Sequence, residues 1–196
     1  MSNDLTEYVK YRPLMKTGDP LLYLSKGQPL GWMIQKFTEY NHAGAVVCFG
    51  PDECGVDRVW TLEAVGRGVV PAFLSDKLSH YHGDVYWQPL NPNYDDRRHL
   101  ILECAMMLKG TDYDFKSLLK NLFGYVSVNF QQLFCSEFWF ALMWYAKILK
   151  GDIAPRPGDI PDFKIYDPLF PDPVQIIKYI EPTKIINLEE SMVVGQ

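Results

Sequence analysis

The sequence predicts an α+β domain in which helices pack against a central, mostly antiparallel sheet. Short apolar or alternating runs, separated by glycine and proline turns, recur through the N-terminal half and are typical of strands. Longer stretches with apolar residues at helical spacing follow between residues 94 and 149. The 196 residues fit a single domain, residues 1–196, and a hydrophobic content of 47% is ample for one core.

The predicted strands are short and bounded by turn signals. Residues 1–17 are polar and mixed, and we expect an N-terminal arm or short helix there. Gly18, Asp19 and Pro20 then mark a turn into the first strand, and residues 50–55 form the turn of an antiparallel hairpin. In chain order the predicted strands are residues 21–24, 43–49, 58–65, 66–71, 84–88, 175–180 and 184–188.

The longest predicted helix is also the most apolar part of the chain. It covers residues 133–149, and we expect it to be buried centrally and to end at Lys150 and Gly151. After it, residues 154–173 interleave prolines with aromatic and aliphatic residues, which predicts an ordered surface wrap. Helices are also expected at residues 31–37, 94–108 and 116–122, and the second of these places Leu100, Ile101, Cys104, Met107 and Leu108 on one broad face.

The net charge and the first residues restrict the classes of partner. With a net charge of −5 and a pI near 5.3, the chain has no general electrostatic attraction for nucleic acid or anionic membranes. Residues 1–7 lack the basic and then apolar run of a secretory signal. The densest apolar run, residues 138–146, is shorter than the ~20 residues that span a bilayer. We therefore expect a cytoplasmic protein with no nucleic-acid partner and no integral membrane segment.

The cysteines and histidines give little sign of a metal site. In a reducing compartment cysteines without paired spacing are expected to be thiols rather than disulfides. His80 and His82, together with Asp84, alternate along an extended segment and are the alternative for a metal site, but a surface turn explains them as well. We expect neither metal nor cofactor. No CxxC pair occurs among the four cysteines, Cys48, Cys54, Cys104 and Cys135.

Cys135 stands near the start of the most apolar predicted helix. Backbone N–H groups and the helix dipole at an N-terminus favour a thiolate over a thiol, which provides a nucleophile near neutral pH. The same N–H groups can stabilise the oxyanion that forms when a carbonyl is attacked. The alternative interpretation is that Cys135 is a small core residue of an aromatic-rich helix.

His42 and Glu63 lie on the two strands of the predicted hairpin. His42 is next to small residues such as Gly44, and Glu63 is a lone glutamate among apolar residues. If the hairpin is centred between Asp52 and Glu53, His42 faces Glu63 across the strands. The carboxylate would then orient the imidazole and stabilise its cationic form. Taken separately, a histidine at a strand end and a solvent-facing glutamate would also explain the two residues.

Taken together, these residues resemble the permuted papain-like, NlpC-like cysteine hydrolases of the YiiX/YaeF-like group. Ordinary papain-like enzymes run nucleophile first, whereas here the order is base, orienting residue, nucleophile, which implies circular permutation. The resemblance therefore implies a circularly permuted papain-like (NlpC-like) fold. It is carried by short motifs in the family's order: Gly18-Asp19-Pro20-Leu21-Leu22, residues 40–47 (YNHAGAVV), Leu62-Glu63-Ala64, residues 110–115 (GTDYDF) and Phe134-Cys135-Ser136-Glu137.

The resemblance also implies a function, a hydrolase that cleaves an amide bond in a peptide or N-acyl compound through an acyl-enzyme. Cys135 would be the nucleophile, His42 the general base and then acid, and Glu63 the orienting residue. Two alternatives remain, a lipid or thioester acyl hydrolase or transferase using the same triad, and a non-catalytic binding module that retains the fold. The expected partner is a small peptide, N-acyl or lipid-like substrate.

Several residues close to these motifs in sequence are candidates for contact with the substrate. Aromatic side chains in such positions either line a groove or belong to the core. A glutamine just before the nucleophile is in addition a candidate oxyanion donor, with a loop amide as its alternative. The candidates are Tyr23, Trp32, Tyr40, Asn41 and Gln132.

Overall fold

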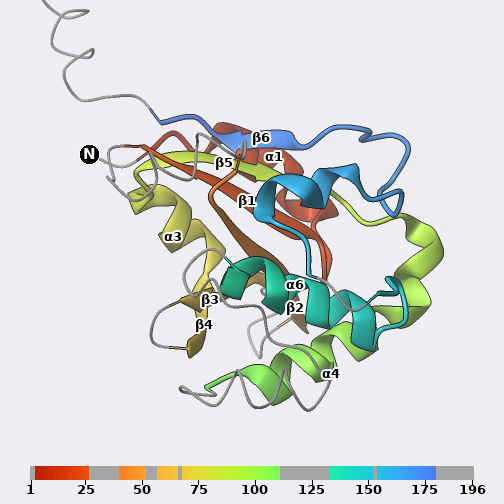
Figure 1. Cartoon of the computed structure of the whole chain (residues 1–196). Helices are drawn as coiled ribbons and strands as arrows, with labels where there is room; N and C mark the ends of the chain where they lie inside the picture. Colours follow the sequence, from red (N-terminus) through yellow and green to blue (C-terminus); the bar gives the residue numbers. More distant parts are fainter. Residues whose placement is uncertain are drawn as a thin grey trace, which may run out of the picture.

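One antiparallel sheet of six strands, in the order β4-β3-β2-β1-β5-β6, organises the described part of the chain (Figure 1). The computed structural model describes residues 3–26, 40–51, 57–65, 68–110, 133–151 and 154–179. The predicted α+β class with an antiparallel sheet is confirmed. The strands are β1 (Pro20–Ser25), β2 (His42–Pro51), β3 (Asp57–Val65), β4 (Gly68–Phe73), β5 (Gly83–Trp87) and β6 (Val174–Ile177).

Helices cover both faces of this sheet, because successive residues of each strand point to opposite faces. Leu22 and Ala45 pack on one face with α4 and α6, whereas Leu21 and Val46 pack on the other with α1 and α3. Figure 1 shows the positions of these four helices around the sheet. The expected helices at residues 31–37 and 116–122 and the expected strand at 184–188 lie outside the described residues. The helices are α1 (Thr6–Tyr11), α3 (Leu74–His80), α4 (Arg98–Leu108) and α6 (Leu133–Tyr145), with 3₁₀ turns η1 (Arg12–Leu14), η2 (Pro92–Arg97) and η3 (Pro157–Asp162).

Helix α6 is buried along its middle, where every residue from Phe138 to Met143 is apolar. Phe138, Trp139 and Leu142 have no exposed surface. The helix ends at Tyr145, four residues before the predicted end at 149. Lys147 adopts a left-handed conformation with φ 58°, and the Ile148 N–H donates back to the Met143 carbonyl, the bonding pattern that commonly closes a helix with glycine. Among the described helices, none has both the length and the hydrophobicity to cross a membrane.

The helix predicted over residues 94–108 divides into two parts. Residues Pro92–Arg97 form the 3₁₀ turn η2, with the Asn91 side chain accepting a hydrogen bond from the Asn93 N–H at 3.0 Å. Helix α4 then begins at Arg98 and buries Ile101, Cys104, Ala105 and Leu108. Met107, which we expected on the buried face, is half exposed.

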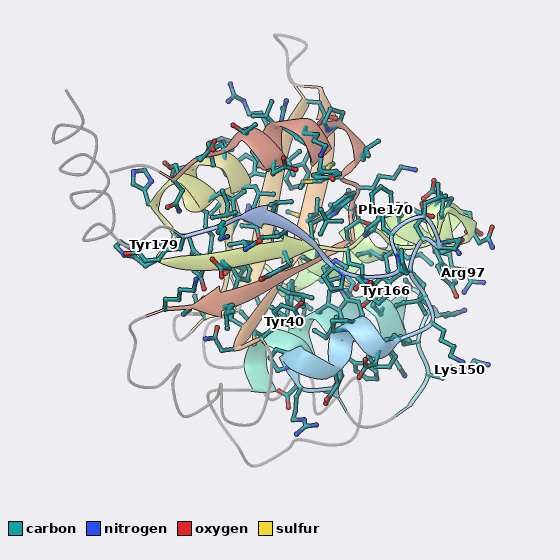
Figure 2. The ribbon with its side chains drawn as sticks, turned by 90° about the horizontal axis from the view of Figure 1, so that it is seen from above. Tyr40, Arg97, Lys150, Tyr166, Phe170 and Tyr179 are labelled. Atoms are coloured by element: carbon teal, nitrogen blue, oxygen red, sulfur yellow. The ribbon has the colours of Figure 1, made fainter. Side chains whose placement is uncertain are left out.

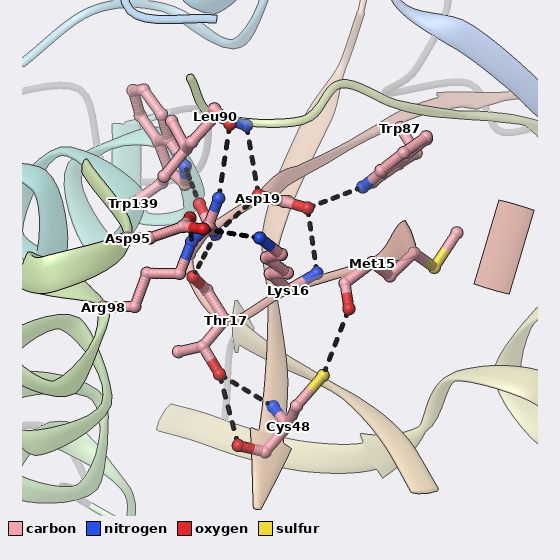
Figure 3. A network of polar contacts seen from close by, with 11 residues as sticks. Met15, Lys16, Thr17, Asp19, Cys48, Trp87, Leu90, Asp95, Arg98 and Trp139 are labelled. Carbon is pink, nitrogen blue, oxygen red and sulfur yellow. Dashed lines mark hydrogen bonds and ion pairs between the residues drawn. The ribbon is translucent and has the colours of Figure 1, made fainter. Parts of the chain in front are cut away.

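A buried polar cluster, the Asp19 hub, joins the start of β1 to β5 and α4 (Figure 3). Asp19 has no exposed surface, and both of its carboxylate oxygens accept two hydrogen bonds. Oδ1 accepts from the Leu90 N–H at 3.1 Å and from Arg98 Nη1 at 2.8 Å. Oδ2 accepts from the Lys16 N–H and from Trp87 Nε1, each at 3.0 Å. Asp19 of the Gly-Asp motif therefore has a structural role, because it connects the start of β1 to β5 and α4.

The turn before β1 is also fastened to the middle of β2. Gly18 has a φ of 97°, a conformation that favours glycine, and its N–H donates to the Val46 carbonyl at 2.9 Å. The Val46 N–H donates in return to the Asp19 carbonyl at 2.9 Å. The hub and the strand that carries His42 are thus parts of one framework.

Residues 154–173, the proline-rich segment, lie against the body of the protein and lead into β6. Ile160 is fully buried, and Tyr166 forms a β-bridge with Leu90. The Tyr166 hydroxyl donates to the Ile160 carbonyl at 2.8 Å. Figure 2 shows Tyr166 and Phe170 on the stretch that connects η3 with β6.

Candidate active site

The β2–β3 hairpin has a different register from the predicted one. Ala45 pairs with Leu62 instead of Trp60, so β3 is displaced by two residues along β2. Because side chains alternate between faces with a period of two, this displacement leaves His42 and Glu63 on the same face. The direct opposition that we predicted is wrong, and the two residues instead meet diagonally.

Glycine at position 44 makes the diagonal contact possible. A Cβ atom at Gly44 would lie 2.7 Å from Glu63 Cγ and 3.1 Å from Thr61 Oγ1. The absence of a side chain there lets Glu63 extend along the sheet until Oε2 is 2.7 Å from His42 Nε2. Gly44 thus leaves the space through which the Glu63 side chain reaches His42.

Glu63 is almost completely buried, at 1% exposure, and its carboxylate contacts four side chains of the described part of the chain. Oε1 accepts from the Tyr23 hydroxyl at 2.8 Å and from Thr61 Oγ1 at 3.1 Å. Oε2 bonds both His42 Nε2 and Lys77 Nζ. Burial raises the pKa of Glu63, but the hydrogen bonds and charges of His42 and Lys77 outweigh it and lower the pKa to about 2. The group is a carboxylate.

The imidazole of His42 connects this carboxylate to Cys135. Burial lowers the pKa of His42, but the negative charge and hydrogen bond of Cys135, followed by those of Glu63, outweigh burial and raise the pKa to about 9. The ring is therefore cationic at neutral pH. Since Nε2 bonds Glu63, Nδ1 is the ring nitrogen that remains for the thiol.

The two partners of the ring come from opposite faces of the sheet. Glu63 is beside Tyr23, on the face covered by α1 and α3, whereas Cys135 is in the first turn of α6, on the other face. His42 is the first residue of β2, so its ring stands at the end of the strand where both can reach it. The His42 side chain keeps 23% of its surface exposed, and Cys135 only 2%.

The structure thus brings together the three residues predicted to form the triad. The other described cysteines, Cys48 and Cys104, have surroundings that favour the protonated thiol. Burial raises the pKa of Cys48 to about 11 and that of Cys104 to about 12. In each case acidic neighbours add to burial, Asp57 for Cys48 and Glu103 for Cys104. Cys54 lies outside the described residues.

The residues predicted to contact a substrate have other surroundings. Tyr23 has no exposed surface and donates to Glu63, so it lies behind the triad and supports the carboxylate. Tyr40 is 4% exposed and packs edge to face on Tyr86, with ring centroids 5.3 Å apart, in the core cluster beside α6.

Asn41 holds the end of β1. Its Oδ1 accepts from the Ser25 N–H at 3.1 Å, and Asn41 is 9% exposed. Its side chain therefore fixes the strand that carries Tyr23 next to the strand that carries His42. Trp32 and Gln132 lie outside the described residues.

The candidate metal ligands are separated by their own contacts. His80 bonds Ser79 and the Asp76 carbonyl, and the ring of His82 lies tilted against that of Tyr179, with centroids 5.5 Å apart. Asp84 instead pairs with Lys26 at 2.8 Å. In the ranges that the structure describes, no group of three or more potential ligands converges on a metal position.

Sequence reasoning missed Lys77 and the helix that carries it. Helix α3 begins directly after β4, and its seven residues contain only two buried apolar positions, Leu74 and Leu78. That spacing of four residues was the available signal for a helix. Nothing in the sequence indicated that Lys77, between the two leucines, would reach Glu63.

No family model matches the sequence, and a search of curated proteins found no match.

Proposed function

We propose that this protein is a cysteine-dependent hydrolase that cleaves an amide bond through an acyl-enzyme. Cys135 is the nucleophile, His42 the base and acid, and Glu63 the residue that orients His42. One observation carries the proposal: a single imidazole ring bonds the Cys135 thiol and, at 2.7 Å, a buried carboxylate. A thiol beside a cationic imidazole is activated as a nucleophile, and a carboxylate on the far nitrogen fixes the ring's orientation.

The reaction follows from these contacts. The Cys135 sulfur attacks the carbonyl carbon and forms a C–S bond, while the carbonyl oxygen becomes an oxyanion near the first N–H groups of α6. When the C–N bond breaks, His42 donates its proton to the leaving nitrogen. Neutral His42 then removes a proton from water as the water attacks the thioester. The C–S bond breaks, the acid is released, and the proton remains with the Cys135–His42 pair.

The order of the base, the orienting residue and the nucleophile along the chain supports a proposal for the fold, a circularly permuted papain-like arrangement. The base is on β2, the orienting residue on the adjacent β3 and the nucleophile in the first turn of a buried helix that follows both. Papain-like enzymes use these three kinds of element for the same three roles. A mostly antiparallel sheet with α6 packed on one face agrees with that arrangement.

One observation favours a different class of protein, a non-catalytic binding module that retains the fold. Cys135 is only 2% exposed, and a buried thiol bonded to a histidine can be part of a core. The two classes differ in the reactivity of the thiol, because a nucleophile must meet reagents from solution and a core thiol need not.

Labelling of the full chain with iodoacetamide at pH 6 separates the two classes. Peptide mass spectrometry reports the rate at each cysteine. We expect Cys135 to react at least about tenfold faster than Cys48 and Cys104, whose raised pKa values keep them protonated at this pH. Equal rates at the three positions would contradict the proposal.

The matched variants are His42→Ala and Cys135→Ser. His42→Ala leaves Glu63 paired with Lys77, so the fold should survive, while the labelling of Cys135 should fall to the rate of Cys48. With any amide substrate found by screening, both variants should abolish turnover and keep the circular dichroism spectrum of the wild type. Unchanged turnover in either variant would remove that residue from the mechanism.

A further inference from the structure

Lys77 contacts the candidate triad from outside it. Its ammonium group bonds Glu63 Oε2, the same oxygen that His42 Nε2 contacts at 2.7 Å. The group also lies over two aromatic rings, 5.0 Å from the centroid of Tyr23 and 6.0 Å from that of Tyr81. Two cations therefore share one carboxylate oxygen, and one of them belongs to no step of the proposed reaction.

The position of Lys77 is fixed by its helix. Leu74 and Leu78 of α3 are fully buried on the sheet, and the helix follows β4 without a linker. The rings of Tyr23 and Tyr81 attract the ammonium group through cation–π interactions. The lysine side chain is 24% exposed, a low value for a residue type that is almost always in water.

We propose that Lys77 is a positioning residue, which acts through Glu63 as the counter-ion that stays with the carboxylate while His42 gives up its proton. Lys77 has this role only if the triad is catalytic, so it depends on the proposed function. When His42 donates its proton, Glu63 loses one of its two cationic partners while still buried. Lys77 remains as the counter-ion, and the cost of an unpaired buried carboxylate is avoided.

The charges of the cluster show the effect of the lysine. With a thiolate and an imidazolium the four groups Cys135, His42, Glu63 and Lys77 sum to zero, and with a thiol and a neutral imidazole they again sum to zero. Proton transfer between sulfur and nitrogen therefore leaves the site neutral in both states. Without Lys77 both states would carry a net negative charge, and the imidazolium would be held more tightly by Glu63.

Two tyrosines next to Glu63, Tyr23 and Tyr81, stay protonated near neutral pH. Burial raises the pKa of Tyr81 to about 12 and that of Tyr23 well above its ordinary value. Within the described ranges, the groups that face His42 are Cys135 from α6, Glu63 from β3, the Tyr23 ring from β1 and, through Glu63, Lys77 from α3. Replacing Cys135 with alanine removes the first of these and isolates the effect of the lysine on the ring.

The test is a titration of the His42 ring by NMR in the full chain carrying Cys135→Ala. The signal is assigned among the four histidines by its loss in a His42→Gln variant. Adding Lys77→Met should strengthen proton binding by the ring about tenfold, because a positive charge on the shared oxygen is removed. Lys77→Arg, which keeps the charge, should restore the parent titration. Lys10→Met, which removes an exposed charge paired with Glu7, is the matched control and should change nothing.

A purely structural lysine would give a different result. If Lys77 only supports Glu63, its loss lets the carboxylate move away and proton binding by His42 weakens. Weaker or unchanged proton binding in Lys77→Met would overturn the inference. Lys77→Gln, which retains a hydrogen-bond donor, has the same expected direction and serves if the methionine variant does not fold.

Labelling of Cys135 in the otherwise wild-type chain separates this inference from the proposed function. Slow labelling with a shifted His42 titration would reject the catalytic triad and leave only the coupling between Lys77 and His42. Rapid labelling with an unshifted titration would reject the role of Lys77 alone.

Discussion

Asp19 before β1 and Glu63 in β3 are the two most deeply buried carboxylates among the residues that the structure describes, and their partners are of different kinds. Asp19 accepts hydrogen bonds from two backbone N–H groups, from an indole and from Arg98. Among the described residues, the partners of the Glu63 carboxylate are side chains, and one of them is an imidazole that can lose its proton. A carboxylate bonded to the backbone fixes chain segments, whereas one bonded to a titrating ring can respond to a reaction.

The pKa values of the two groups move in opposite directions. Burial raises the pKa of Asp19, and the charge of Arg98 does not fully offset it. For Glu63 the balance between burial and neighbouring cations is the opposite, because two cationic side chains outweigh burial and lower the pKa to about 2. Burial alone therefore says little about whether a carboxylate is charged. The hydrogen bonds and charges of its neighbours must be weighed against burial.

Removing the cation of the Asp19 hub should have the largest effect on stability. Arg98→Met leaves the Asp19 carboxylate buried without a counter-ion, which typically costs about 3–5 kcal/mol in the free energy of unfolding. Urea unfolding at pH 7 measures the loss. Lys16→Met, which removes the exposed partner of Asp95 in the same network, is the control and should cost less than about 1 kcal/mol. Similar losses in the two variants would mean that the buried pair of Asp19 and Arg98 does not stabilise the fold.

Glu63→Gln should lower the free energy of unfolding, and the size of the loss should depend on pH. The pKa of Glu63 is lowered from an ordinary 4.5 to about 2, so its ionised form stabilises the fold above pH 4.5. This stabilisation is lost as the pH falls through about 2 and amounts to something on the order of 3 kcal/mol. Urea unfolding of wild type and variant at several pH values between 7 and 2 measures the difference, which should shrink with acidity.

The same variant also tests the role of Glu63 in the triad. A glutamine can still bond the ring but supplies no charge, so the labelling of Cys135 at pH 6 should fall by less than it does in His42→Ala. Exposed Glu7, replaced by glutamine, is the matched control for both measurements. Labelling at or above the wild-type rate in Glu63→Gln would remove the carboxylate from its orienting role.

Gly44→Ala should give a smaller effect that is confined to the site. The added Cβ would lie 2.7 Å from Glu63 Cγ, so the glutamate must move and its contact with His42 weakens. Overpacking of this kind costs about 1–3 kcal/mol in the free energy of unfolding. Urea unfolding and labelling of Cys135 should both report the change. In a Glu63→Ala background the effect of Gly44→Ala should become smaller, and an unchanged effect would mean that the clash is with other atoms.

The elements that sequence reasoning found are those with strong local patterns. The compact apolar run at residues 43–49 and the apolar stretch from 133 gave β2 and α6 because their hydrophobic patterns exceed what a loop carries. The predicted end of α6 was wrong because Lys147 closes the helix in the left-handed conformation, for which a glycine is the usual sequence signal. The register of β2 and β3 was wrong because it is determined by the turn and by packing across the sheet, which no local pattern contains.

The candidate site was predictable in its residue types but not in its supports. His42, Glu63 and Cys135 were found from motifs, and an even register error left the pair on one face. Tyr23 and Lys77 hold Glu63 through contacts 40 and 14 residues apart in the chain. Such contacts depend on the order of strands and on the placement of α3, so a reading along the sequence does not reveal them.

The direct junction between β4 and α3 constrains the length of the chain at this point. Phe73 ends the strand and Leu74 begins the helix, so no residue between them can absorb a change. One inserted residue would turn the helix by roughly 100° about its axis. The ammonium group that now meets Glu63 would then point along a different side of the helix. An insertion or deletion at this boundary would therefore disturb the site without altering any of its side chains.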